Sequence, residues 1–186
     1  MTSFNIAASL AYWARETPDQ SAIIEMRNKT QVTFIQLDKE SSLIASGLLH
    51  NGMKTGDRVL LMVPYGTIFV TLAFALFKAG AVPVLIDPGM GKKNVLHCIQ
   101  QSAPRGIIGI PLVHAIKTLF PSAFKSIQLS VTVGRKWCWS GLTLSQIKRS
   151  GQTDYQMAEV LEDQTAAVLF TSGSTGPAKG VLYTHY

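Results

Sequence analysis

Short apolar runs that are too brief for independent helices recur along the chain, and they constrain its fold more than any other feature. They are Arg58–Val63, Val82–Ile86, Gly106–Ile110 and Ala166–Phe170. Strands that are covered on both faces have this appearance, because no position along them faces water. Segments with helical spacing separate the runs, an alternation that is typical of parallel pairing with right-handed crossovers. The sequence therefore predicts an α/β fold with a doubly wound, mostly parallel sheet.

The segments around these runs complete the pattern. Residues Thr33 to Gln36 form a capping box, in which the Thr33 side chain accepts from the Gln36 amide while the Gln36 side chain reaches back. This signal predicts a helix that runs to about His50. The other expected elements are helices at Phe4–Arg15, Ile68–Lys78, Lys92–Gln101, His114–Leu119 and Thr143–Lys148, and strands at Ala22–Glu25, Gln31–Thr33 and Ile127–Val133.

The most apolar stretch, Thr67–Ile86, is the best candidate for a membrane span in a chain that is 47% hydrophobic. Lys78 lies near its middle and would cost about 2.5–3.5 kcal/mol in a bilayer. Gly80 and Pro83 then interrupt it, which leaves an unbroken apolar part better suited to a core helix. We expect a helix, a turn and a buried strand here, and no membrane span.

The formal net charge of +6 suggests an anionic partner, which could be a small ligand, a nucleic acid or a membrane surface. The sequence has no nucleic-acid-binding signature, so we expect no nucleic-acid partner. The first residues lack the features of a secretory signal, which favours a cytoplasmic protein.

Several tempting side chains have plain structural interpretations. Cys98 and Cys138 lack the spacing of a metal site or a disulfide framework, and we expect two buried, reduced thiols. His97 lies in an apolar setting and is expected to be structural, as is His114. The two indoles that flank Cys138, those of Trp137 and Trp139, are expected to pack in the core.

The stretch from Leu169 to Val181, LFTSGSTGPAKGV, places small and hydroxyl-bearing residues directly after an apolar run. Glycines allow backbone N–H groups to approach a ligand closely, and such a loop forms an anion-binding concavity. Lys179 adds a mobile cation, so the combination suits a polyphosphate. The spacing does not match the Walker A loop, because Ala178 stands where the second glycine is needed and Gly180 follows the lysine. A dinucleotide-binding GxGxxG loop is absent, and a plain solvated loop is the remaining alternative.

These residues resemble the phosphate-binding signature of the adenylate-forming superfamily, which includes acyl-CoA synthetases, luciferases and nonribosomal peptide adenylation domains. The usual form has proline immediately before the lysine, whereas this chain has Ala178 there and Pro177 one position earlier. The likeness extends to Gly56–Val59, which matches the family's entry into a strand, and to Lys78–Pro83, which matches the end of its apolar helix.

One branch of the superfamily is similar in further segments. Val63-Pro64, Asp87–Gly91, Ile110–Ala115 and Val133–Trp137 resemble the β-lactone synthetases of bacterial olefin biosynthesis. This likeness implies a fatty or β-hydroxy fatty acid as the substrate. The acyl group would then pass to CoA or close internally to a β-lactone.

The resemblance implies an ATP-dependent ligase that forms acyl-AMP and pyrophosphate, with Lys179 acting on the leaving pyrophosphate. It also implies that residues 1–186 are the N-terminal portion of the large domain, that the ligands of Mg²⁺ lie elsewhere, and that this chain alone is inactive. The alternative is a non-catalytic nucleotide-binding or scaffold module. The implied phosphate-binding residues are Thr171, Ser172, Gly173, Ser174, Thr175, Gly176 and Lys179.

Overall fold

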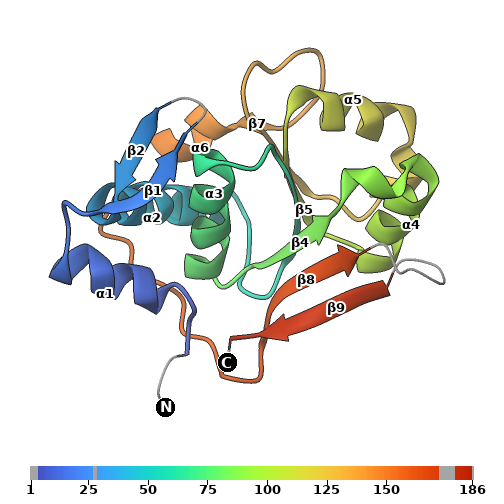
Figure 1. The fold of residues 1–186 in the computed structure, drawn as a ribbon. Helices are drawn as coiled ribbons and strands as arrows, with labels where there is room; N and C mark the ends of the chain where they lie inside the picture. The colour runs from blue at the N-terminus through green and yellow to red at the C-terminus, as the bar shows by residue number, and fades with distance from the viewer. Residues whose placement is uncertain (1–3, 27–28, 172–178, 186) are drawn as a thin grey trace.

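The computed structural model describes residues 4–26, 29–171 and 179–185. These residues contain a seven-stranded sheet in the order β7-β6-β5-β3-β4-β8-β9 (Figure 1). Every pair in it is parallel except β8–β9. The predicted mostly parallel α/β sheet is therefore confirmed. The strands are β3 (Arg58–Met62), β4 (Val82–Ile86), β5 (Gly106–Gly109), β6 (Leu129–Thr132), β7 (Leu142–Thr143), β8 (Thr165–Thr171) and β9 (Lys179–Thr184).

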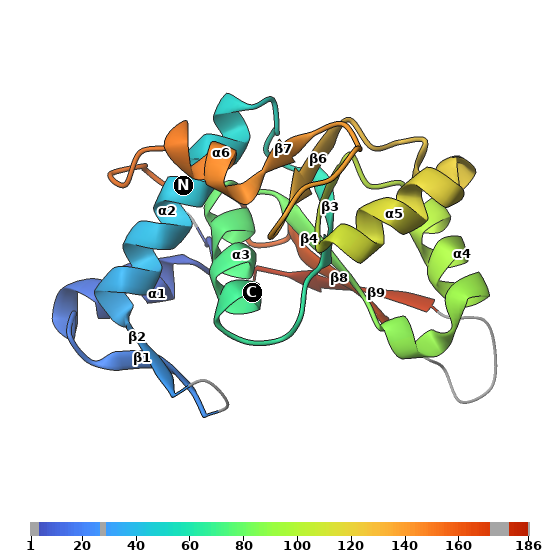
Figure 2. The same ribbon diagram turned by 90° about the horizontal axis from the view of Figure 1, so that it is seen from above.

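Helices cover both faces of this sheet, as Figure 2 shows from above. One face carries α2 (Phe34–His50), α3 (Thr67–Lys78) and α6 (Leu144–Arg149), whose apolar side chains pack with those of β3. The other face carries α4 (Lys92–Ser102), α5 (Pro111–Leu119) and the 3-10 turn η2 (Pro121–Phe124). The sheet is doubly wound because the crossover β3–α3–β4 uses one face, whereas β4–α4–β5 and β5–α5–β6 use the other.

The N-terminal part of the chain attaches to this body through side chains. Helix α1 (Ala8–Glu16) is followed by a hairpin of β1 (Ser21–Glu25) and β2 (Thr30–Thr33). The helix begins at Ala8 and not at Phe4, because the Asn5 side chain donates to the carbonyl oxygens of Phe77 and Ala158 at 2.8 and 3.0 Å. These bonds tie the preceding residues to the end of α3.

The helix that the capping box predicts is confirmed as α2. The Thr33 side chain accepts from the Gln36 amide, and the Gln36 side chain accepts from the Thr33 amide at 3.0 Å. The β1–β2 hairpin also contacts α3, because the Glu25 carboxylate accepts a hydrogen bond from the Thr67 hydroxyl at 3.0 Å. The hairpin thus reaches the first turn of the helix that follows β3.

Lys78, the last residue of α3, is a buried cation that joins the two long helices on one face. Its Nζ donates to Asp38 Oδ1, to the Asp38 carbonyl oxygen and to Ser42 Oγ, each at 2.7 Å. Burial lowers the pKa of Lys78, while the hydrogen bond and the negative charge of Asp38 oppose that shift. The pairing secures α3 against α2, where an uncompensated buried charge would be costly.

Three expectations from the sequence are corrected. Cys98 is buried as expected, but Cys138 is exposed. Trp137 is 66% exposed and does not pack in the core. His97 is exposed on α4.

The structure also adds elements beyond those expected. They are the short strand β7, the antiparallel strand β9 and two 3-10 turns, η1 (Pro88–Met90) and η2. The stretch Thr67–Ile86 is a helix, a turn and a strand, as expected. Among the described residues, no helix is long and apolar enough to cross a membrane.

Replacing Asp38 by alanine should lower the free energy of unfolding by about 3 kcal/mol, because the Lys78 ammonium would stay buried without its carboxylate. The matched control is Glu40→Ala, which breaks the half-exposed Glu40–Lys148 pair and should cost less than about 1 kcal/mol. Urea denaturation followed by circular dichroism measures both. Equal losses in the two variants would contradict a special contribution of the buried pair.

Candidate functional site

The parallel strands end at a common edge of the sheet, and two neighbouring connections diverge there. β3 leads into α3 on one face, whereas β4 leads into α4 on the opposite face. Ligands of open α/β sheets bind at such a switch point, in the crevice beyond the carboxyl ends of the strands. At this edge, residues 64–66 come after β3 and residues 87–91 come after β4. Strand β8 ends at the same edge.

Strand β8 is held in register on both sides. Ile86 of β4 pairs with Phe170, and β9 pairs antiparallel with the same segment of β8. In this register Lys179, the first residue of β9, lies directly opposite Thr171, the last residue of β8. Residues opposite one another in an antiparallel ladder direct their side chains to the same face. The structure therefore brings together the hydroxyl and the cation at the two ends of the predicted loop.

Gly180 is required by the close approach of β9 to the core. A Cβ atom at this position would lie 2.9 Å from Cζ and 3.0 Å from Cε1 of the Phe170 ring. Phe170 is 4% exposed and belongs to the apolar cluster between the sheet and α4, so its ring has little freedom to move. In the sequence, Gly180 served only to exclude a Walker A loop, and its packing role was missed because that role depends on the register of β9.

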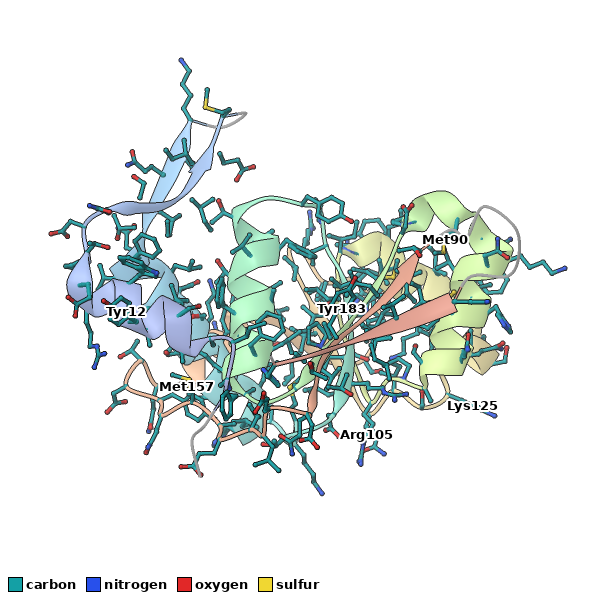
Figure 3. All side chains as sticks on the ribbon, turned by 60° about the horizontal axis from the view of Figure 1, so that its bottom comes forward. Tyr12, Met90, Arg105, Lys125, Met157 and Tyr183 are labelled. Atoms are coloured by element: carbon teal, nitrogen blue, oxygen red, sulfur yellow. The ribbon has the colours of Figure 1, made fainter. Side chains whose placement is uncertain are left out.

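The connection from β4 to α4 lies beside the end of β8. Asp87 Oδ1 accepts from the Gly89 amide at 2.8 Å, which shapes the turn η1. Met90 packs against the cluster that contains Phe170, and Figure 3 shows it beside the end of β8. The segment 87–91 is therefore a turn that borders the candidate site.

The remaining predicted ligands of phosphate fall outside the described residues. Thr171 and Lys179 are described, and both are exposed. The other predicted phosphate ligands lie outside the described residues, and they are Ser172, Gly173, Ser174, Thr175 and Gly176.

Two histidines, His114 and His185, are buried or half-buried, and each makes a contact that stabilises the fold. His114 Nε2 lies 3.1 Å from the Val131 carbonyl oxygen, and burial lowers its pKa. This residue is structural, as the sequence predicts. His185 Nδ1 accepts from the Ile6 amide at 3.3 Å, at the far end of β9 from Lys179. Strand β9 ends at Thr184, directly before His185.

A groove of about 1050 Å³ lies between the β1–β2 hairpin, α2 and the start of α3. Its wall includes Val32, Leu37 and Ile68 together with the polar residues Thr67 and Thr71. Figures 1 and 2 place this hairpin and the carboxyl end of β8 on opposite sides of the molecule. In the part of the chain that the structure describes, no group of three or more His, Cys, Asp or Glu side chains is placed to hold a metal ion.

Comparison with known proteins gives a consistent result. Residues 10–186 match the family described as AMP-binding enzyme. An olefin beta-lactone synthetase of Xanthomonas campestris is 43% identical over 99% of this chain, and one of Stenotrophomonas maltophilia is 41% identical over 97%. A medium-chain fatty-acid–CoA ligase of Escherichia coli is 30% identical over 96% of the chain. The chain spans 33–35% of the length of these relatives.

Solved structures share the fold at lower identity. An anthranilate CoA ligase, AuaEII, in complex with anthranoyl-AMP superposes with a TM-score of 0.88 at 19% identity, over 98% of this chain and 35% of that one. A long-chain-fatty-acid–CoA ligase of Archaeoglobus fulgidus gives 0.85 at 22% identity, over 99% and 37%.

Replacing Gly180 by alanine should lower the free energy of unfolding by about 1–3 kcal/mol, because the new Cβ overlaps the Phe170 ring. Phe170→Leu removes the ring atoms that the Cβ would meet. In a double-mutant cycle, Gly180→Ala should therefore cost less in the Phe170→Leu background than in the native protein. If the losses in the free energy of unfolding simply add, the Phe170 ring is not what excludes a side chain at position 180.

Proposed function

The chain belongs to the family of AMP-binding enzymes, and we propose that it supplies the phosphate-binding part of a ligase that activates a carboxylic acid with ATP. The observation that carries this proposal is the pairing of Thr171 with Lys179 at the carboxyl edge of the sheet. That pairing closes the hydroxyl- and glycine-rich segment between two ordered strands. We propose residues 1–186 as the N-terminal portion of the adenylation domain, consistent with their matching about a third of each relative.

In the proposed reaction a carboxylate oxygen of the acid attacks the α-phosphorus of ATP. The bond between that phosphorus and the oxygen bridging to the β-phosphorus breaks, which gives acyl-AMP and releases pyrophosphate. Negative charge grows on the leaving group during this step. A cation fixed beside the leaving phosphates stabilises the transition state more than the bound substrate, which is the condition for a faster reaction.

We propose that Lys179 is the cation that stabilises the leaving pyrophosphate. The hydroxyl groups that contact the phosphates would be those of Thr171, Ser172, Ser174 and Thr175. Gly173 and Gly176 would let the backbone amides approach the β- and γ-phosphates. Lys179 fits this role because it is exposed and begins a strand whose register is set by its pairing with β8. The exposed Thr171 hydroxyl, opposite Lys179 in this ladder, fits phosphate contact in the same way.

Mg²⁺ bound with the nucleotide would screen the charge of the triphosphate. The described residues do not group into a resident site for it. As the family resemblance implies, we propose that its protein ligands lie outside this chain.

The relatives named above support a fatty or β-hydroxy fatty acid as the substrate. Two of them are named olefin beta-lactone synthetases, and a third is named a medium-chain fatty-acid–CoA ligase. For the acyl-AMP we consider two fates. The thiol of CoA displaces AMP, or the β-hydroxyl oxygen of the same acyl group displaces AMP to close a four-membered lactone.

The lactone outcome requires a β-hydroxyl group, and this requirement makes it testable. With a β-hydroxy fatty acid and ATP but no CoA, the complete protein should release AMP and a β-lactone that mass spectrometry detects. The matched acid without the hydroxyl should support pyrophosphate exchange but give no lactone. When CoA is added in a parallel assay, formation of a thioester from both acids, with no lactone from either acid with or without CoA, would assign the protein to CoA ligation.

Lys179→Ala in the complete protein should reduce the rate of ATP–pyrophosphate exchange about 100-fold, as loss of one stabilising contact to developing charge does elsewhere. The KM for the acid should change little, because the lysine meets phosphate and not the acyl chain. Lys54→Ala, which removes an exposed lysine before β3, is the matched control and should behave as the native protein. An unchanged exchange rate with a raised KM for the acid would overturn the assignment.

A further inference from the structure

The positive charge of this chain is concentrated in one continuous segment. Between Asp87 and Asp154, residues 88–153 contain nine of the 17 Lys and Arg residues and none of the 11 Asp and Glu residues. The rest of the chain carries the other eight basic residues and all the acidic ones, so its formal charge is negative. The net charge of +6 therefore describes a polarised molecule.

Two of these nine cations have acidic partners from outside the segment. Arg105 lies 3.6 Å from Asp57 Oδ1, and Lys148 pairs with Glu40. Within the part of the chain that the structure describes, the other seven make no ion pair. Four of them lie around α5: Lys92, Lys93, Arg135 and Lys136.

Helix α5 presents large apolar side chains to solvent between these cations. Leu112 and Leu119 are 64% and 73% exposed and stand seven residues apart, which places them on the same side of the helix. The opposite side is anchored in the fold through Val113 and His114, both buried. The exposed leucines therefore lie on a rigid element.

The connection after β6 adds an exposed indole beside the first half of α5. The Trp139 ring stacks on the His114 ring at a centroid distance of 5.7 Å, and its Nε1 donates to Thr132 Oγ1 at 2.9 Å. These contacts hold the connection against the helix. Trp137, with its ring 5.9 Å from that of Trp139, is 66% exposed and directly follows Arg135 and Lys136.

The far end of α5 is also basic. Lys92 Nζ lies 4.8 Å from the centroid of the Phe120 ring, which follows Leu119, and Lys93 is exposed beside it. Cations thus stand near both ends of α5, whose exposed side carries the two leucines. We refer to Lys92, Lys93, Leu112, Leu119 and residues 135–137 as the α5 surface.

We propose that the α5 surface docks on a membrane that contains anionic lipid. Headgroups of such a membrane attract Lys and Arg, an indole is stabilised at the boundary between headgroups and chains, and leucines gain by entering it. One lipid interface accommodates all three kinds of side chain, whereas duplex nucleic acid would leave the leucines and the indole exposed. The absence of acidic residues throughout 88–153 removes a source of repulsion. This inference does not depend on the proposed reaction.

Cosedimentation of the complete protein with lipid vesicles tests the proposal. The protein should bind vesicles of phosphatidylcholine mixed with phosphatidylglycerol and should not bind phosphatidylcholine alone. Removal of two cations in Lys93→Gln/Arg135→Gln should weaken binding about fivefold per charge. The control Lys39→Gln/Lys54→Gln removes the same charge from exposed positions outside the segment and should retain native binding.

A fluorophore on the exposed thiol reports whether the indole enters the interface. Cys98 is 0% exposed, so within residues 1–186 a thiol-directed, polarity-sensitive dye attaches at Cys138, next to Trp137, and the signal that Cys138→Ser removes is the one read. Its emission should rise and shift to the blue with anionic vesicles, and Trp137→Gln should reduce this response.

Three results would overturn the proposal. The first is a failure to bind anionic vesicles, and the second is an equal loss of binding in the test and control variants. The third is stronger binding to polyglutamate or to duplex DNA than to vesicles, which would assign the α5 surface to a protein or nucleic-acid partner.

Discussion

Strand β8 hydrogen-bonds to β4 on one side and to β9 on the other, and the geometry of the candidate site depends on this double pairing. The parallel ladder with β4 sets where Thr171 emerges from the sheet. The antiparallel ladder with β9 returns the chain to the same edge at Lys179. The Phe170 ring fills the space that a side chain at position 180 would need, so core packing and site geometry are coupled through one glycine.

The two faces of the sheet differ in whether their charged side chains are buried or exposed. On the face of α2 and α3, a buried lysine is neutralised by Asp38 and donates to Ser42, which joins two consecutive helices. On the face of α4 and α5, cations and large apolar side chains are directed outward. The first arrangement stabilises the fold, and the second provides a surface for a partner.

The sequence predicts the body of this fold because its signals are local. The central strands β3, β4 and β5 consist almost entirely of apolar residues and glycine, and the capping box at Thr33 marks the start of α2. Strand β9 was missed because Val181, Leu182 and Tyr183 form an exposed edge, where the pattern of burial gives no guide. For the site, the sequence indicates Thr171 and Lys179 as loop ends, but their direct opposition depends on a ladder register that no local pattern encodes.

Exposure of individual side chains was harder to predict than secondary structure. The sequence suggests core packing for Trp137, because indoles are usually buried, yet its neighbour Trp139 occupies the place against His114. The pairing of Lys78 with Asp38 also joins positions forty residues apart, which only the packing of α3 on α2 brings together.

The position of β8 in the sheet has a consequence for biosynthesis. Val84 of β4 pairs with Val168, so eighty-four further residues must be synthesised before this edge of β4 is covered. At a typical rate of translation that interval lasts about 4–17 s. During this time the nascent chain presents the open edge of an apolar strand, the kind of surface that pairs with other chains. Newly made chains therefore pass through a period of several seconds in which a ribosome-bound chaperone has a defined segment to protect.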